Sequence, residues 1–446
     1  MNSRRWIVTC LWLQLITAGS LGAAAEWWQF RGPQAGHVEG QGFPLRWGSF
    51  FDEPLWKTQL PGKGWSSPIV IDQRIWLTSA EQVALDTGQA AEKLAELPLG
   101  ARDLVAHATV RLMALELDAE TGQLLRRIDL FECPNPQPIH AMNSHASPTP
   151  TTDGGHVYCH FGALGTACIE IASGQVLWSR QLVTEEITGG AASPVLHRDC
   201  LYLSCDGADQ QYVIALDKLT GTTRWKVDRP SIKVPDDSWR RSFSTPVIVD
   251  TADRCQLISM SAQWLISYNP ADGSQWWQAK VGEGYSAVPT PVCLGDLVLV
   301  CTGFTNPELV AVDISGSGDV TETAIRWRYT RQVPEISSPI IVGQEVYFAS
   351  SQGVVTCLDV ATGKQHWQQR LGGNFAASPI VAEGRIYFTN NSGVTTVIAP
   401  GHEYIELEKN ELFGESFASL AIYHDSFLLR TNPFLFRLGK RPAPLP

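Results

Sequence analysis

The chain has 446 residues and a formal net charge of −11 at pH 7, with 44% hydrophobic residues, 38 glycines, 27 prolines and 16 tryptophans. The acidic balance argues against nucleic acid as a partner, because affinity for nucleic acid comes mainly from Lys and Arg side chains that neutralise phosphates. The apolar content suffices for a large core, and the many glycines and prolines favour an all-β chain rich in turns.

Residues 1–25 have the features of a secretory signal peptide. Arg4 and Arg5 precede a short apolar stretch, and residues 23–25 are three alanines that form a small-residue cleavage site. We therefore expect an exported protein, periplasmic or extracellular. The paired arginines leave open whether the twin-arginine or the general secretory route is used, and an uncleaved anchor is the alternative reading of the apolar stretch. No later segment is apolar enough to span a membrane.

After an N-terminal extension at residues 26–52, a small residue followed by proline and an apolar run recurs along the chain. Successive copies lie about 40 to 50 residues apart, the spacing of four-stranded propeller blades, except for a longer first interval. The copies are Ser67-Pro68, Ser147-Pro148, Ser193-Pro194, Thr245-Pro246, Thr290-Pro291, Ser338-Pro339 and Ser378-Pro379, with Ser419-Leu420 as a degenerate eighth copy.

Each unit predicts four short strands. Residues 338–371 show the pattern: apolar runs with two-residue alternation are separated by Gly and Asp turns, and the last run contains a tryptophan. In four units this tryptophan follows a turn glycine by four residues, so we expect these rings to be buried at equivalent places between blades. The tryptophans concerned are Trp178, Trp225, Trp277 and Trp367.

The ends of the repeat predict how the ring closes. The eighth unit supplies three strands, near residues 420–423, 427–429 and 434–436, and lacks its tryptophan strand. An orphan strand around Trp56 precedes the first copy and would complete the last blade, which removes two exposed sheet edges. We predict an eight-bladed β-propeller over residues 53–439, with Trp56 in the same blade as Phe427 and Phe434, and a tail at residues 440–446.

Two local features interrupt the repeat. Residues 81–111 contain Ala and Glu at helical spacing, which predicts a helical insertion in the first blade. Cys159 and Cys168 flank a Gly-rich turn, so they form either a disulfide across a hairpin or two small buried side chains. Nine cysteines follow the signal peptide, an odd number, and no Cys-x-x-Cys motif occurs.

The Ser-Pro step, the Tyr-Phe pair, the Leu-Asp-x-x-Thr-Gly turn and the following Trp resemble the pyrroloquinoline-quinone-like (PQQ-like) propeller repeat, from about Trp56 to Leu438. The stretch at residues 28–33, Trp-Gln-Phe-Arg-Gly-Pro, resembles the start of secreted quinone-binding-like propellers of planctomycete-type bacteria. The resemblance implies an eight-bladed ring. Members similar to the assembly scaffold BamB bind partner proteins, whereas others are quinone-dependent alcohol dehydrogenases.

The dehydrogenase alternative implies PQQ and calcium. Those enzymes stack the quinone on a vicinal cysteine pair, and this sequence has no Cys-Cys. Calcium requires several hard oxygen ligands, and no compact cluster of carboxylates and amides is visible in the sequence. We therefore expect no cofactor and no catalytic residues, and a secreted non-catalytic binding or scaffold protein, with a PQQ-dependent dehydrogenase as the alternative.

The loops that lead into the innermost strands converge at one mouth of the channel, and loops commonly carry function. We expect a protein partner or a small polar ligand there, bound by a monomer. The alternatives are a merely solvated rim and a partner groove beside the insertion. The candidate binding residues are Lys63, Trp65, His140, Asn143, His145, Arg240, Arg241, Glu283, Tyr285, Asn374 and Glu415.

Other chemistry has little support in the sequence. His140 and His145 could join Glu335 or Glu415 in a metal site, but their spacing on an irregular loop fixes no geometry, and we expect no metal. The sequence has no Gly-x-Ser-x-Gly, His-Glu-x-x-His or phosphate-loop motif.

Overall fold

A computed structural model describes residues 27–48, 53–95, 97, 103–412 and 414–440. The expected signal peptide and most of the expected tail lie outside these residues. No helix in the described ranges is long and apolar enough to cross a membrane.

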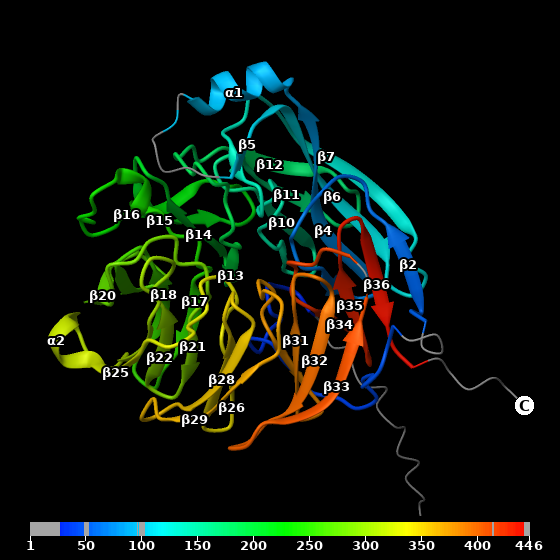
Figure 1. Ribbon diagram of the computed structural model, residues 1–446. Coiled ribbons are helices and arrows are strands. Elements are labelled where there is room, and N and C mark those ends of the chain that lie inside the picture. The colour runs from blue at the N-terminus through cyan, green and yellow to red at the C-terminus, as the bar shows by residue number, and fades with distance from the viewer. Residues whose placement is uncertain (1–26, 49–52, 96, 98–102, 413, 441–446) are drawn as a thin grey trace, which may run out of the picture.

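Eight antiparallel blades of four strands are arranged in a ring around a central channel, as the repeat predicts (Figure 1), and one short parallel strand extends the sheet of blade 4 and another that of blade 7. Blades 1 to 4, innermost strand first, are β3, β4, β6 and β7 (Ile69–Ile71, Arg74–Ala84, His107–Asp118, Leu124–Pro134), β9 to β12 (Thr151–Thr152, His156–His160, Thr166–Glu170, Val176–Arg180), β13 to β16 (Val195–His197, Cys200–Asp206, Gln211–Asp217, Thr223–Asp228) and β17 to β20 (Val247–Asp250, Cys255–Met260, Trp264–Tyr268, Gln275–Lys280).

The remaining blades repeat this order. Blades 5 to 8 are β21, β22, β23 and β25 (Val292–Leu294, Leu297–Cys301, Leu309–Asp313, Ile325–Tyr329), β26 to β29 (Ile340–Val342, Glu345–Ala349, Val354–Asp359, Gln365–Arg370), β30 to β33 (Ile380–Ala382, Arg385–Thr389, Val394–Ala399, Ile405–Glu411) and β34, β35, β36 and β2 (Ala421–Tyr423, Ser426–Arg430, Phe434–Leu438, Trp56–Gln59). Short elements in the connections are η1 (Asp237–Arg240), β24 (Gly318–Asp319) and α2 (Thr321–Ala324).

The predicted closure of the ring is confirmed. Strand β2 pairs antiparallel with β36, which brings Gln59 opposite Phe434 and Trp56 opposite Arg437. Phe427 lies in the neighbouring strand β35 and pairs with Leu438. The N-terminal strand therefore covers the outer edge of the last blade, which would otherwise present unpaired backbone groups.

A belt of hydrogen bonds joins the innermost strands. In seven of the eight blades, the backbone N–H of the Ser or Thr at the repeated position donates to the side-chain hydroxyl of its counterpart in the next blade. The seven bonds are Ser67 to Thr149 (2.9 Å), Thr149 to Ser193 (3.0 Å), Ser193 to Thr245 (2.9 Å), Thr290 to Ser338 (3.0 Å), Ser338 to Ser378 (3.0 Å), Ser378 to Ser419 (2.9 Å) and Ser419 to Ser67 (3.0 Å). Because a hydroxyl is the acceptor in every bond, the repeat requires Ser or Thr at this place.

The belt corrects the sequence alignment of the second blade. Thr149, which precedes Pro150, occupies the repeated position, and not Ser147 as the sequence analysis assumed. The run Ser147-Pro148-Thr149-Pro150 carries the motif twice, two residues apart, so the pattern alone could not choose between the copies. Ser147 donates instead to Oδ1 of Asn143, at 2.6 Å.

The tryptophans occupy equivalent positions, as expected, and each ring packs against the following blade. Four indole N–H groups donate to carbonyls in the next blade's turn: Trp56 to Ala119, Trp178 to Lys218, Trp225 to Pro270 and Trp367 to Gly401. Trp327 is a fifth equivalent, bonded to Val360 and missed because an insertion disturbs its spacing from glycine. The indole N–H of Trp277 donates to the side chain of Gln256 instead. Trp225, Trp277 and Trp367 are buried, as expected, whereas Trp178 is half-buried.

The turn glycines explain how closely these rings pack. A Cβ atom on Gly221 would lie 2.7 Å from the ring of Trp178, and one on Gly273 would lie 2.8 Å from the ring of Trp225. Both glycines have positive φ, so the turn and the flat contact each favour glycine. The glycine turn of one blade is thus the surface on which the tryptophan of the previous blade rests.

The insertion in blade 1 is shorter than predicted. Strands β4 and β6 continue through both ends of the expected range, with Glu81 opposite Arg111 and Ala84 opposite His107. Between them, α1 (Thr87–Ala95) projects from the rim, and β5 (Leu104–Val105) pairs with β8 (Ile139–His140) (Figure 1). The helical spacing correctly predicted α1, but the predicted insertion was too long. The residues on either side of the helix belong to the two strands of a long hairpin.

Of the two alternatives for Cys159 and Cys168, the disulfide is wrong. In the hairpin of β10 and β11, Cys168 lies opposite Tyr158, whereas Cys159 lies opposite Ala167. Neighbouring residues of a strand point to opposite faces, so the two thiols lie on different sides of blade 2. All nine described cysteines are free, and both of these are fully buried. The alternative, two small buried side chains, is therefore correct.

Residues 27–38 cross the end of the channel that lies opposite the mouth. Trp27 pairs with Val70 of blade 1, and the carbonyl of Trp28 accepts from Thr152 of blade 2. Arg31 Nη2 then donates to the carbonyl of Pro339 in blade 6, at 2.8 Å. Finally β1 (His37–Val38) pairs with β30 of blade 7. Because blades 2 and 6 face each other in an eight-membered ring, the segment closes this end.

Candidate functional site

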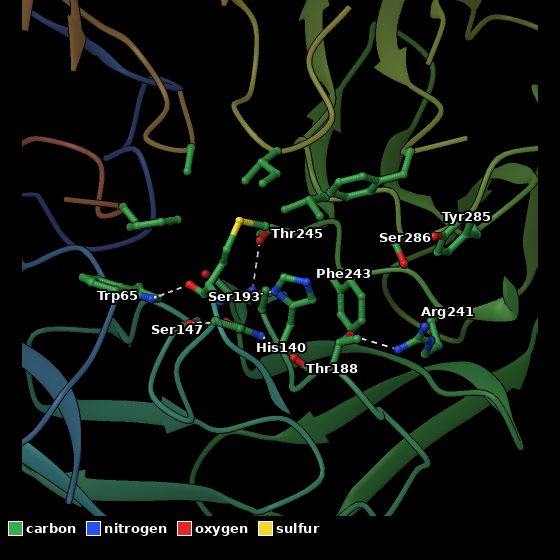
Figure 2. A pocket seen from close by; sticks show the side chains of 18 of the residues that line it. Trp65, His140, Ser147, Thr188, Ser193, Arg241, Phe243, Thr245, Tyr285 and Ser286 are labelled. Carbon is green, nitrogen blue, oxygen red and sulfur yellow. Dashed lines mark hydrogen bonds between the residues drawn. The ribbon is translucent and has the colours of Figure 1, made fainter. Parts of the chain in front are cut away.

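A cavity of about 430 Å³ occupies the mouth of the channel. Its size is that of a small-ligand site. All eight loops that lead into innermost strands contribute to its wall, together with η1, the β5–β8 pair and Phe30 of the crossing segment (Figure 2). The sequence expectation that these loops converge is therefore met by the geometry.

The cavity wall is built in two layers. The deeper layer consists of the belt hydroxyls of Ser67, Thr149, Ser193, Thr245, Ser338, Ser378 and Ser419. The upper layer consists of the residues two positions earlier, because alternate residues of extended backbone point the same way. These residues are Trp65, Ser147, Ala191, Phe243, Val288, Ile336, Ala376 and Phe417.

The deep layer offers hydrogen-bond donors. Each belt hydroxyl accepts a backbone N–H through its oxygen, and no described residue accepts a hydrogen bond from it in return. A hydroxyl has one O–H donor besides its acceptor lone pairs. The hydroxyl protons are therefore available to a ligand that carries acceptor oxygens.

Two aromatic stacks stand on different parts of the wall. Trp65 stacks on Phe417 with ring centroids 4.7 Å apart, and its indole N–H donates to the carbonyl of Met142 at 2.9 Å. Trp239 of η1 stacks on Tyr285 at 5.1 Å with an interplanar angle of 12°. Figure 2 shows Trp65 on one side of the cavity and Tyr285 with Arg241 on the other. The space between the stacks therefore suits a flat or apolar group.

Arg241 is the cation of this wall. Its Nε donates to the carbonyl of Ser238 at 2.5 Å, and Nη1 donates to the carbonyl of Glu186 and to Oγ1 of Thr188. The residue is 5% exposed, and burial lowers the pKa of its guanidinium. It forms no ion pair with a described residue, and Nη2 makes no hydrogen bond within the described ranges. The fixed guanidinium thus keeps a donor and an unpaired charge beside the cavity.

The acids near Arg241 are occupied or poorly ionised. Asp236 accepts from the backbone N–H of Ser238 and caps η1. Hydrogen bonding by the Ser238 side chain, followed by this backbone bond, lowers the pKa of the Asp236 carboxyl. Burial raises the pKa of Glu186 to about 7. Asp237 pairs with Arg240 at 2.6 Å, whereas Arg241 has no ion pair among the described residues.

The structure brings five of the eleven candidate residues together and separates the other six from the cavity. The residues that line it are Trp65, His140, Asn143, Arg241 and Tyr285. Lys63 Nζ lies over the Trp65 ring, 5.1 Å from its centroid, and Arg240 and Glu283 pair with Asp237 and Lys280. Asn374 and Glu415 are exposed on the rim, where their backbones bond Asn391 and Asn432.

His145 is also outside the mouth, although the sequence analysis placed it there. It is 5% exposed and faces a second, much smaller cavity together with Glu186. Its Nε2 lies 3.4 Å from Nδ1 of His107, and burial followed by the charge of His107 lowers its pKa to about 3. The insertion of blade 1, which contributes Ala106 and His107, covers this histidine, an effect that loop position alone does not reveal.

Sequence reasoning missed Phe243 and Phe417 in the upper layer and Phe304, Met142 and Phe30 elsewhere in the wall. The first two could have been found from the repeat, because they stand two positions before Thr245 and Ser419. Phe304 belongs to a loop between the second and third strands of blade 5, and Phe30 arrives from the crossing segment. Neither has a signal in the repeat.

The described donors do not fit a calcium ion with its quinone. Asp103 and Asp236 are the acidic residues of the described wall, and no cysteine lines it. A metal could be held at another place, between blades 6 and 7. There, three His and Glu side chains of the described ranges lie close enough together to bind one ion. Calcium takes six to eight oxygen ligands, which two separate carboxylates do not supply.

Comparison with solved structures agrees with this fold. BamB from Moraxella catarrhalis is 13% identical, with a TM-score of 0.53, and the match covers 86% of this chain and 100% of that one. The computationally designed Ika8 protein is 11% identical, with a TM-score of 0.54 and coverage of 86% and 98%. A europium-containing methanol dehydrogenase is 10% identical, with a TM-score of 0.57 and coverage of 91% and 89%. At such identities these similarities show the fold alone.

No curated protein matches the sequence significantly. The family model described as outer membrane protein assembly factor BamB matches residues 51–263, 114–362 and 323–402, which together span well over half of the chain. The repeat, the eight closed blades and this match agree, and the chain belongs to the BamB-like family of PQQ-like β-propeller repeats.

Proposed function

We propose that this protein is an exported, non-catalytic binding propeller that holds its partner at the channel mouth. The observation that carries the proposal is the unpaired, immobilised Arg241 beside a cavity that also offers a layer of hydroxyl donors and two aromatic stacks. The Arg241 cation and the hydroxyl donors favour a ligand with a carboxylate, and the aromatic walls favour an apolar group next to it. A peptide or small molecule with both features fits the site.

Two further facts support binding over chemistry. No described lining residue is paired with another in the manner of a nucleophile and its base, and His140, the lining histidine, accepts at Nδ1 from the backbone of Met142 in its own turn. The family match is to a protein described as an assembly factor, which is consistent with a scaffold role. The dehydrogenase alternative has only the shared fold in its favour, and a shared fold does not imply a shared site.

The test compares two adjacent arginines in the mature chain. Arg241→Met removes the lining cation, whereas Arg240→Met removes an arginine that pairs with Asp237 and does not line the cavity. The probes are tripeptides with a C-terminal phenylalanine, supplied either as the free carboxylate or as the amide, and calorimetry measures their binding.

We expect the free carboxylate to bind and the amide to bind at least about tenfold more weakly, since a charge-assisted hydrogen bond contributes roughly 1.5–3 kcal/mol. Arg241→Met should remove this preference, and Arg240→Met should keep it. Equal binding of both peptides, or equal effects of both substitutions, would contradict the proposal. Arg241→Lys, which keeps the charge without the fork, checks that a loss is not caused by misfolding.

A further inference from the structure

Three side chains of metal-binding types converge at the face of the ring opposite the mouth. Glu345 begins β27, His366 is the second residue of β29, and His402 lies in the turn between β32 and β33 of the next blade. Strand β26 runs away from the mouth. The hairpin between β26 and β27, the turn between β28 and β29, and the turn between β32 and β33 therefore lie at the opposite end of the ring. One ligand atom of each residue lies within 4.8 Å of those of the other two.

The two imidazoles are arranged face to face. The ring centroids of His366 and His402 are 4.0 Å apart, and the rings are inclined by only 8°. Nε2 of His402 lies 2.9 Å from Oε1 of Glu345. Nε2 of His366 is buried and has no hydrogen-bond partner among the described residues. A buried imidazole nitrogen without a partner is uncommon, and a metal ion is one way to satisfy such an atom.

The backbone around these ligands is held by other contacts. The N–H of Gly401 donates to the hydroxyl of Tyr347 at 2.8 Å, and its carbonyl accepts from the indole of Trp367 at 2.9 Å. This places the turn that carries His402 firmly against blade 6. The side chain of His402 is 66% exposed and that of Glu345 is 19% exposed, so the histidine can rotate to close the site. The nearby carboxylate of Asp359 is occupied by Thr362 of its own turn.

We propose that Glu345, His366 and His402 bind one Zn²⁺ ion and thereby clamp blade 6 to blade 7. Two imidazoles and a carboxylate form a donor set typical of zinc, with water in the fourth position, whereas calcium and magnesium prefer oxygen ligands only. The sequence does not reveal this site, because its ligands come from two blades and their spacing matches no motif. The site is independent of the mouth, so it can fail or hold without affecting the proposed function.

The experiment uses the mature chain freed of metal and titrated with Co²⁺, which replaces Zn²⁺ and absorbs visible light, and with Zn²⁺ by calorimetry. We expect one equivalent to bind, with the absorption bands of a nitrogen and oxygen site. His402→Ala should weaken binding by more than about tenfold, and since its side chain is exposed, this variant should fold. Glu345→Gln should weaken binding in the same way.

His156→Ala is the matched control. This histidine also lies beside a carboxylate, Asp153 at 3.2 Å, but has no third ligand, so its loss should leave binding unchanged. Zn²⁺ should raise the thermal midpoint of the parent chain and of His156→Ala but not that of His402→Ala. The proposal is overturned if no equivalent of Co²⁺ or Zn²⁺ binds, if His402→Ala binds as tightly as the parent, or if near-ultraviolet thiolate bands place the metal on a cysteine.

Discussion

The backbone N–H of Thr290 donates to the hydroxyl of Ser338 at 3.0 Å, while the hydroxyl of Thr290 itself is buried without a partner. This is the one place in the described belt where the chain of bonds is interrupted, because no bond joins the N–H of Thr245 to Thr290. The two residues have the same role in the repeat but are expected to contribute differently to stability.

Ser338→Ala should lower the free energy of unfolding by about 1–3 kcal/mol, because it leaves the buried N–H of Thr290 without an acceptor. Thr290→Val should be neutral or stabilising, because it removes a buried hydroxyl that bonds nothing. Thermal and denaturant unfolding of both variants measure the difference. Equal destabilisation by the two substitutions would show that the belt bonds do not matter individually.

The stack of Trp239 on Tyr285 should hold η1 against the mouth. Trp239→Ala removes the contact between rings 5.1 Å apart, and we expect about 0.5–1.5 kcal/mol of stability to be lost together with most binding of the free-carboxylate peptide. Calorimetry with that peptide and thermal unfolding separate the two effects. Trp327→Ala, far from the mouth and packed on blade 6, is the control: it should destabilise the fold more and, where folded, still bind.

Stability should depend on pH through Glu186. Its pKa in the folded protein is raised to about 7 by burial, above the value of about 4.5 expected in the unfolded chain. Between these values the folded state binds more protons than the unfolded state, so this residue's contribution is favourable at low pH and is lost as the pH rises from about 4.5 through 7. His145, whose pKa is lowered to about 3, acts in the opposite direction over pH 3 to 6.5.

Glu186→Gln isolates the first of these effects, because His145 is present in both chains. At pH 8 the free energy of unfolding of the variant should exceed that of the parent by about 1–3 kcal/mol. Glu186 is partly exposed, and screening by water favours the lower part of this range. At pH 4.5 the two chains should unfold at nearly the same denaturant concentration. A difference that does not change with pH would mean that Glu186 stays charged in the folded state.

Much of the architecture is determined by local sequence. The Ser-Pro steps, the strand alternation and the tryptophan four residues after a turn glycine are properties of single blades. Eight such blades with one strand missing at the end require the strand around Trp56 to close the ring. The local pattern was ambiguous in two places. The doubled motif at Ser147 and Thr149 allowed two registers, and the turn between Cys159 and Cys168 did not reveal which faces of the hairpin the two thiols occupy.

The sequence by itself therefore determined the fold class, the number of blades and the end of the channel at which the loops meet, because these follow from short-range periodicity repeated eight times. Only the tertiary structure decided which loop residues face the cavity, because that depends on contacts between distant segments. The insertion buries His145, the capped turn η1 leaves Arg241 unpaired beside the wall, and the crossing segment places Phe30 in the channel. The convergence of Glu345, His366 and His402 likewise exists only where two blades meet, and no spacing along the chain encodes it.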